Sequence, residues 1–184
     1  EASADVMWRR VQQLYAGLGY NDTWGSEIIY RYCHQPLADE IEEIQRLVGE
    51  HSVDLVVVDS LGLACGGEPE QAAIALGVFR ALRSLKITSL VIHHQNKTAK
   101  MFGSVYIENM ARNVWEVVRG QEEAEKKIDV GLYHRKANDG ALLKPLGVSI
   151  LFEDTAVLVK KQDIRAVPGL SERLRLHEQI DSVL

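Results

Sequence analysis

Two stretches of the chain are mostly apolar and end in polar residues. The first covers residues 53–58 and is followed by Asp59 and Ser60. The second covers residues 88–94 and ends in a pair of histidines. Runs rich in Leu, Val and Ile of this length are typical of strands that are buried on both faces of a parallel sheet. We therefore predict two such strands, each covered by helices on both sides.

Helical spacing of apolar residues precedes and separates these strands. A first helix is predicted over 6–18, where glycines close the segment. A short β-prone stretch, 28–33, comes before an acidic amphipathic helix that opens at Pro36. A third helix is predicted from Pro69 to about Leu85, because proline is tolerated in a first helical turn. The alternation of strand and helix predicts right-handed crossovers and a parallel sheet.

The second half of the chain has a different pattern, with short β-prone segments and short polar connections. Strands are predicted over 113–118, 128–135, 148–152 and 156–159. Glu153 and Asp154 lie between the last two, where a hairpin turn is expected. These strands are expected to be antiparallel.

A further amphipathic helix is predicted after Pro168 and Gly169, with Ser171 as its cap. We expect a linker or helix over 166–184 that leads towards a further module, such as a winged helix, or packs on a neighbouring subunit. The chain begins at Glu1 with an amphipathic pattern already present by Val6, so we expect it to be part of a longer protein.

Composition is that of a soluble globular protein. The chain has 184 residues, of which 46% are hydrophobic and 26% charged, and no segment approaches a membrane-spanning length. A net charge of −5 argues against nucleic-acid binding over a whole face, but it permits a local basic loop. Cys33 and Cys65 are expected to be idle thiols in a reducing cytoplasm, with a disulfide as the alternative.

The acidic end of the first apolar run is the strongest candidate for chemistry. Ligands of parallel sheets bind at the carboxyl ends of the strands, where Asp59 and Ser60 are expected to lie. A carboxylate at that edge is suited to hold a hydrated Mg²⁺ beside a nucleotide phosphate. The alternative is that Asp59 only caps the following loop or helix.

Three motifs in order suggest a family. Residues 55–60 resemble a Walker B strand, and residues 90–97 resemble the sensor strand of RecA-like ATPases. Residues 103–117 are similar to the helix and strand that follow the sensor in replicative hexameric helicases. The match is best to the RepA-like branch and covers about residues 1–159.

The resemblance implies a three-layer RecA-like α/β fold, with parallel core strands flanked by helices and antiparallel strands at the C-terminal edge. Residues 1–165 would be a partial ATPase domain that lacks its first strand, its phosphate-binding loop and the strand after it. ATP and Mg²⁺ would be the cofactors, and the intact protein would be a hexamer that acts on single-stranded DNA without contacting membranes.

Several residues take roles by this resemblance. Asp59 would bind Mg²⁺ through water, and His94 would lie near the γ-phosphate and report its presence. His94 is otherwise a partly exposed histidine at a strand end. His93 should point to the opposite face, which makes the two histidines a poor metal pair. Glu1 resembles the acidic residue that positions the attacking water, or is merely a solvated end.

Basic residues complete the expected site. Arg135 and Lys136 resemble the basic run from which an arginine finger reaches a neighbouring subunit's γ-phosphate, with Arg119 as a competing candidate. Alternatively they are ordinary solvated charges at a strand end. Lys97 and Lys100 lie on the loop that faces the central channel in hexameric helicases, where they would contact the nucleic-acid backbone; the alternative is a solvated loop.

The sequence also departs from the family. It contains no G-x-x-x-x-G-K-[ST] motif, and Gly66 and Gly67 are followed by glutamates that would repel a triphosphate. These residues alone are therefore expected to be inactive as an ATPase. Rival interpretations are an assembly or regulatory RecA-like domain without catalysis, a RecA-like ATPase that does not unwind DNA, and a receiver-type signalling domain, whose acidic pair and lysine are not recognisable.

Overall fold

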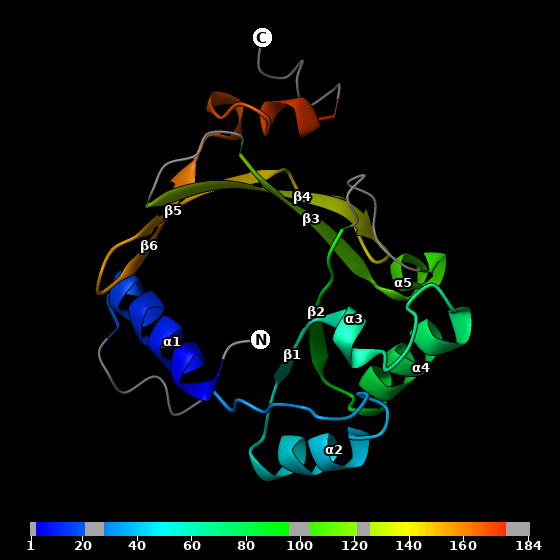
Figure 1. Ribbon diagram of the computed structural model, residues 1–184. Helices are drawn as coiled ribbons and strands as arrows, with labels where there is room; N and C mark the ends of the chain where they lie inside the picture. Colours follow the sequence, from blue (N-terminus) through cyan, green and yellow to red (C-terminus); the bar gives the residue numbers. More distant parts are fainter. Residues whose placement is uncertain (1–2, 21–27, 96–103, 121–125, 176–184) are drawn as a thin grey trace. The chain divides into compact units, whose positions relative to one another are not determined.

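The computed structural model describes residues 3–20, 28–95, 104–120 and 126–175, which form two units (Figure 1). Arg31–Ala111 form one unit, which contains the parallel strands and is called the parallel unit below. Glu1–Tyr30 and Arg112–Leu184 form the other, called the antiparallel unit. Each unit has its own cluster of buried apolar side chains.

The parallel unit is built around two strands, β1 (Leu55–Asp59) and β2 (Thr88–Ile92). They pair in parallel, with Leu55 opposite Thr88 and Asp59 opposite Ile92. The short helix α3 (Leu61–Ala64) and the longer α4 (Ala72–Ser84) lie between them in the sequence and make the crossover. The register confirms the predicted parallel strand pair. The two helices give the connection the length that a parallel crossover needs.

Helices α2 (Ile41–Glu50) and α5 (Val105–Met110) complete the core of the parallel unit. Its buried members include Ile44, Leu61, Val78, Phe79, Leu82 and Ile107, which come from all four helices. Val56, Val58 and Val91 pack against this cluster from the strands. Because side chains alternate along a strand, these three valines lie on one face of the strand pair. The core to which all four helices contribute therefore lies on that face.

Within the parallel unit taken by itself, the other face of the strand pair is not covered by described residues. Val57 is 53% exposed and Leu90 is 55% exposed, and Leu55 and Ile92 are exposed as well. The prediction that these strands are buried on both faces is therefore wrong for the described residues of the parallel unit taken by itself. An apolar run predicts a strand, but whether a second layer covers it depends on other parts of the chain.

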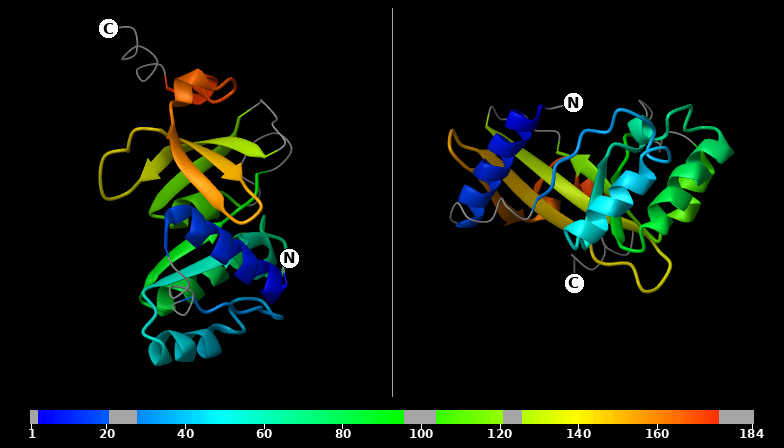
Figure 2. Two further views of the ribbon diagram at one scale, coloured as in Figure 1. Left: turned by 90° about the vertical axis from the view of Figure 1, so that its left-hand side faces the viewer. Right: turned by 90° about the horizontal axis from the view of Figure 1, so that it is seen from below.

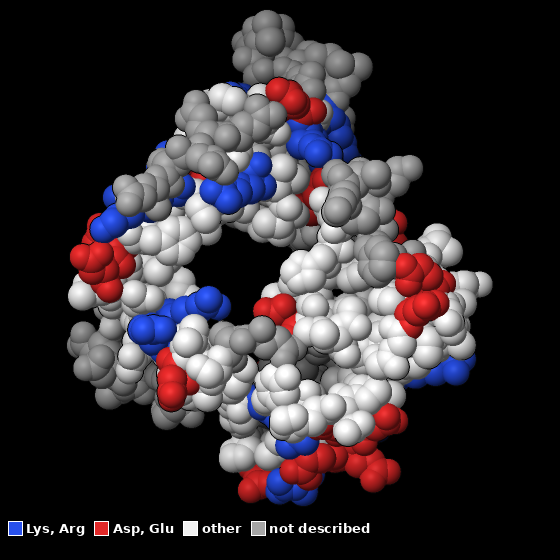
Figure 3. All heavy atoms as spheres, in the orientation of Figure 1, with Lys and Arg blue, Asp and Glu red and all other residues white. Residues whose placement is uncertain are grey.

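Helix α2 begins later than its sequence predicts. Pro36 begins a turn, and the helix starts only at Ile41. The carboxylate of Glu40 accepts hydrogen bonds from the backbone N–H groups of His34 and Gln35, at 2.8 and 2.9 Å, and thereby fixes the turn. Charged side chains gather over the exposed surface of α2, where Arg46 pairs with glutamates on its own helix (Figure 3).

Residues 28–33 do not form the predicted strand. Their backbone is irregular, and in the described part of the chain β1 pairs with β2 only. A β-prone segment becomes a strand when a neighbouring strand completes its hydrogen-bond ladder. Arg31 instead donates from Nε to Glu40 Oε2 at 3.2 Å, which ties the segment to the start of α2.

The Glu40 carboxylate should give a clear pH signature. Its hydrogen bonds from the Arg31 side chain and from the Gln35 backbone lower the pKa of Glu40 to about 2. Because the folded-state pKa lies below the unfolded one, these contacts stabilise the unit above about pH 4.3, and their contribution is lost as the pH falls towards the folded pKa. NMR titration of the Glu40 carboxyl carbon should show the low midpoint in the wild type and a higher one in Arg31→Ala. A wild-type midpoint near the ordinary carboxyl range would contradict this.

The antiparallel unit contains a four-stranded meander. Its strands are β3 (Asn113–Arg119), β4 (Lys127–Ala137), β5 (Leu146–Phe152) and β6 (Val157–Gln162), in that order across the sheet (Figure 2). All neighbours are antiparallel, as predicted. The turn at Glu153 is also confirmed, since its N–H donates to Ala156 O at 2.9 Å. Among the described strands, these four form a sheet of their own.

Helix α1 (Ala4–Leu18) lies against β6 and confirms the first predicted helix (Figure 2). Gly19 ends it in the left-handed conformation, with φ 77°, and its N–H donates to Ala16 O at 3.1 Å. Gly17 is required by packing, because a Cβ there would lie 1.8 Å from the carbonyl oxygen of Val157. Gly19 therefore closes the helix as predicted, whereas Gly17 lies within the helix and serves close packing instead.

The C-terminal segment forms short 3-10 turns, η2 (Ile164–Ala166) and η3 (Ser171–Arg173), rather than the predicted α-helix. Leu174 has an extended backbone and is buried beside Leu170 in the core of the antiparallel unit. Burial of these two side chains against Tyr133 competes with helical geometry, which explains why the helix is absent from 171–175. The remainder of the predicted helix, 176–184, lies outside the described residues.

Tyr133 holds this segment through a buried hydrogen bond. Its hydroxyl donates to Leu170 O at 2.5 Å. Tyr133→Phe should lower the free energy of unfolding by about 1–2 kcal/mol, because the carbonyl loses its donor while the ring remains. Urea unfolding measures this, and Tyr106→Phe, at an exposed tyrosine of α5, is the control. Equal free energies of unfolding for Tyr133→Phe and the wild type would contradict the proposed contribution of this hydrogen bond to stability.

The cysteines do not form a disulfide. Cys33 is exposed and Cys65 is buried, and both are free thiols. Desolvation raises the pKa of each thiol.

Among the described residues, no helix combines the length and the hydropathy that a bilayer crossing needs.

Candidate functional site

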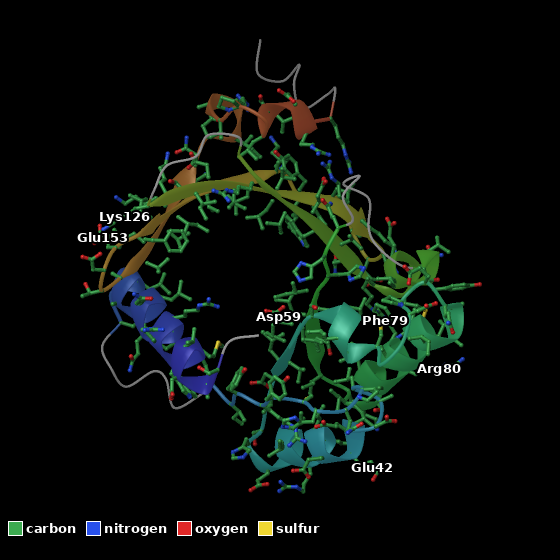
Figure 4. All side chains as sticks on the ribbon, viewed as in Figure 1. Glu42, Asp59, Phe79, Arg80, Lys126 and Glu153 are labelled. Carbon is green, nitrogen blue, oxygen red and sulfur yellow. The ribbon has the colours of Figure 1, made fainter. Side chains whose placement is uncertain are left out.

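Asp59 is the last residue of β1 and lies at the carboxyl end of the strand pair (Figure 4). Its neighbour across the pair, Ile92, is the last residue of β2. The Asp59 side chain is exposed, whereas the next residue, Ser60, is buried. The peptide bond between them is cis. The chain thus presents a carboxylate at the edge where parallel sheets bind ligands.

The turn after Asp59 is anchored by the residues that follow it. Leu61 is fully buried and begins α3. The N–H of Ala64 donates to Ser60 O, and the N–H of Cys65 donates to Leu61 O, both at 3.0 Å. A buried leucine and a hydrogen-bonded turn therefore fix the backbone directly behind the Asp59 carboxylate.

Ser60, not Asp59, is the N-cap residue of α3. Among the described residues, the Asp59 carboxylate has no hydrogen-bond or ion-pair partner. The alternative that Asp59 caps the following helix is therefore not what the structure shows. An exposed carboxylate without a protein partner is suited to bind a ligand from solution.

The two histidines after β2 differ in exposure. His93 is half-buried and His94 is exposed, as expected for side chains that alternate between the faces of an extended segment. His94 follows β2 at the same edge at which Asp59 ends β1. Asp59 and His94 thus both lie at the carboxyl end of the strand pair, within the parallel unit.

The metal-binding capacity of this edge rests on one carboxylate. Within the described ranges, no three His, Cys, Asp or Glu side chains gather into a metal site. Mg²⁺ prefers oxygen ligands and keeps several water molecules, so one carboxylate together with phosphate oxygens fits it. Asp59 therefore fits a hydrated Mg²⁺ but not a cation that needs a full protein cage.

The predicted basic residues lie in the antiparallel unit. Arg135 and Lys136 are on β4, and Arg119 ends β3. The Arg135 guanidinium donates to Glu116 Oε2 from Nε at 2.8 Å and from Nη2 at 2.6 Å. With its side chain only 27% exposed, Arg135 is more than a solvated strand-end charge.

Three predicted site residues, Glu1, Lys97 and Lys100, lie outside the described residues, so their roles stay predictions.

The sequence did not reveal the surroundings of Arg135. Glu116 lies on β3, opposite Tyr133 on β4, and both side chains contact Arg135. A single carboxylate within the apolar run of β3 was the available signal. It has no meaning until the register of the two strands is known, because the pairing decides which basic residue it meets.

A second feature of β4 was also missed. His134 stacks on Trp115, with ring centroids 4.4 Å apart. Its Nδ1 accepts from the N–H of Leu143 at 3.1 Å, so Nε2 carries the hydrogen and donates to Asn113 Oδ1 at 3.2 Å. This histidine connects β3, β4 and the loop before β5, and it has a structural role.

Comparison with solved structures supports the predicted α/β fold class, with parallel strands and a separate antiparallel sheet. One similar structure is that of the KaiC-like protein PH0186 from the hyperthermophilic archaeon Pyrococcus horikoshii OT3, with a TM-score of 0.50 and 16% sequence identity. The match covers 67% of this chain and 56% of that chain, so the chain spans little more than half of its length. No protein-family model and no curated protein matches the sequence. At this identity the similarity shows the fold alone.

Proposed function

We propose that these residues are part of a RecA-like ATPase domain that binds ATP with Mg²⁺ and couples hydrolysis to DNA processing, as a replicative helicase does. The observation that carries the proposal is the exposed Asp59 carboxylate at the carboxyl end of β1, without a protein partner among the described residues. Its backbone is fixed by the buried Leu61, so the carboxylate is presented to solvent from a rigid turn. Such an edge is where nucleotides bind in sheets of this kind.

Asp59 and Ser60 would hold the metal and the nucleotide. A carboxylate binds Mg²⁺ through its water ligands, and the cation neutralises charge on the β- and γ-phosphates. His94 follows the neighbouring strand at the same edge and would donate to the γ-phosphate. Loss of that phosphate on hydrolysis would remove the contact and report the change to the loop beyond it.

The phosphate-binding loop is not among these 184 residues, since the sequence contains no G-x-x-x-x-G-K-[ST]. Gly66 does not replace it: with φ 64°, it packs so closely on Pro36 that a Cβ would lie 2.1 Å from the proline ring. This glycine serves a tight turn. We therefore place the phosphate cradle on a segment outside these residues.

Residues from a neighbouring subunit would complete the site. Arg135 is the first candidate for a contact to the γ-phosphate in trans, and Lys136 and Arg119 are the alternatives. Glu1 would position the attacking water. Lys97 and Lys100 would contact single-stranded DNA in the channel of a hexamer.

A second candidate function is an assembly or regulatory role without catalysis. It is favoured by one observation, that the motif G-x-x-x-x-G-K-[ST] does not occur in the sequence of 184 residues.

Hydrolysis and unwinding assays on the full-length protein test these alternatives. We expect Mg²⁺-dependent release of phosphate from ATP, stimulation by single-stranded DNA, and loss of turnover on removal of Mg²⁺ by EDTA. DNA affinity should fall with salt, since contacts to the backbone release counterions. Hydrolysis without separation of a forked duplex would indicate an ATPase that does not unwind DNA. No binding of ATP at all would indicate the assembly role.

A further inference from the structure

Arg135 is the extra residue of a β-bulge. Along β3, Val114 and Trp115 are consecutive, but their partners on β4 are Lys136 and His134. Arg135 lies between these partners and has no opposite residue on β3. Bulges of this kind change the direction of a side chain and often occur beside active sites. The bulge therefore points the Arg135 side chain in a direction that differs from the regular alternation of side chains along β4.

Glu116 holds the redirected side chain. It accepts from both Nε and Nη2 of Arg135, and its own side chain is only 13% exposed. The Arg135 guanidinium carbon also lies 4.7 Å from the centre of the Tyr133 ring. The bonds to Glu116 use Nε and Nη2, so they do not involve Nη1. Because the guanidinium is planar and is held on the side of Nε and Nη2, Nη1 of Arg135 remains as a hydrogen-bond donor on its other side.

The C-terminal segment supplies a third contact. Arg135 Nη2 also lies 3.3 Å from the backbone carbonyl oxygen of Arg173, and Arg173 Nη1 lies 3.6 Å from Glu116 Oε1. Two guanidinium groups therefore lie against one carboxylate, and these three groups together carry one net positive charge. An excess positive charge in a partly buried setting favours a phosphate or another anion.

We propose that Glu116 is a positioning residue for Arg135, which it holds ready to contact the γ-phosphate of a neighbouring subunit. This inference rests on the proposed ATPase function. An unrestrained arginine loses side-chain entropy when it is fixed, whereas Arg135 is fixed before the nucleotide arrives. We therefore choose Arg135 as the residue that acts in trans, because Glu116 holds its guanidinium.

The test is steady-state ATP hydrolysis by the full-length protein with Glu116→Gln, which keeps the shape of the side chain and removes its charge. We expect kcat to fall by about 100-fold with an unchanged KM for ATP, since a small misplacement of a catalytic group has an effect of that size. Arg135→Lys should do the same, because lysine cannot make the paired bonds to Glu116. The matched control is Asp139→Asn, which removes the carboxylate partner of the exposed Arg112 in the same unit and should keep wild-type turnover.

Mixed oligomers separate positioning in trans from a structural defect. Glu116→Gln subunits retain Asp59, and Asp59→Ala subunits retain a correctly held Arg135. If the two act across an interface, an equal mixture of inactive variants should recover about a quarter of wild-type turnover, because a quarter of the interfaces in a mixed ring combine both intact parts. A folding defect in Glu116→Gln would give no recovery.

The outcomes distinguish this inference from the proposed function. Loss of kcat in Glu116→Gln with recovery on mixing supports it. Undiminished or increased turnover in Glu116→Gln and Arg135→Lys overturns the positioning role, since Glu116 would then be neutral or would hold Arg135 away from the nucleotide. Absence of any Asp59-dependent hydrolysis in the wild type overturns the proposed function and this inference together.

Discussion

Replacing Asp59 by asparagine is expected to lower Mg²⁺-dependent ATP turnover of the full-length protein by about a thousandfold. The side chain keeps its size but loses the charge that would hold the hydrated cation against the phosphates. Three powers of ten in rate correspond to about 4 kcal/mol of lost transition-state stabilisation, which is within the range for one metal-binding contact. Phosphate release at saturating ATP measures the effect.

Asp54→Asn is the matched control for Asp59→Asn. Asp54 is also exposed and directly precedes β1, so it lies at the opposite end of the same strand. Its replacement changes the net charge by the same amount but leaves the carboxyl edge intact, and turnover should stay at the wild-type level. Equal losses in both variants would show that general charge, rather than a metal site at Asp59, explains the effect.

The second large effect is expected at Leu61. Its side chain is fully buried in the core of the parallel unit, directly after Asp59 and Ser60. Leu61→Ala should lower the free energy of unfolding by about 2–5 kcal/mol through lost burial and the cavity that remains. Urea unfolding followed by circular dichroism measures it. The same substitution should weaken nucleotide binding, because α3 supports the turn that presents Asp59.

Leu63→Ala is the control for this substitution. Leu63 belongs to the same short helix but is 63% exposed. Its truncation removes the same atoms from a solvated position and should change stability by less than about 0.5 kcal/mol. If both variants were equally destabilised, the loss would come from helix propensity and not from the core contact of Leu61.

The elements that the sequence predicted well have local causes. The apolar runs before Asp59 and the pair of histidines form parallel strands, and the four later strands form the expected meander. Helix α1 ends where Gly19 adopts a left-handed conformation. Period, length and glycine chemistry act within a few residues of the chain, which is why the pattern alone was sufficient.

The errors have non-local causes. Residues 28–33 have β propensity but do not form a strand, and the residues after Gly169 form a 3-10 turn where a helix was predicted. In the second case the packing of Leu170 and Leu174 against Tyr133 determines the backbone. Such contacts join residues more than thirty positions apart, as the bond from Tyr133 to Leu170 does, and no local pattern encodes them.

The sequence by itself determined the strands, the position of Asp59 at a strand end and the presence of a basic run at Arg135, because these depend on residue order and side-chain period. Only the tertiary structure decided that Asp59 is presented by the buried Leu61 and that it is not a helix cap. Only the strand register, with its bulge, brought Glu116 to Arg135. The physical reason is that register and packing are set by burial and hydrogen bonding between distant segments, whose free energies are summed over the whole fold.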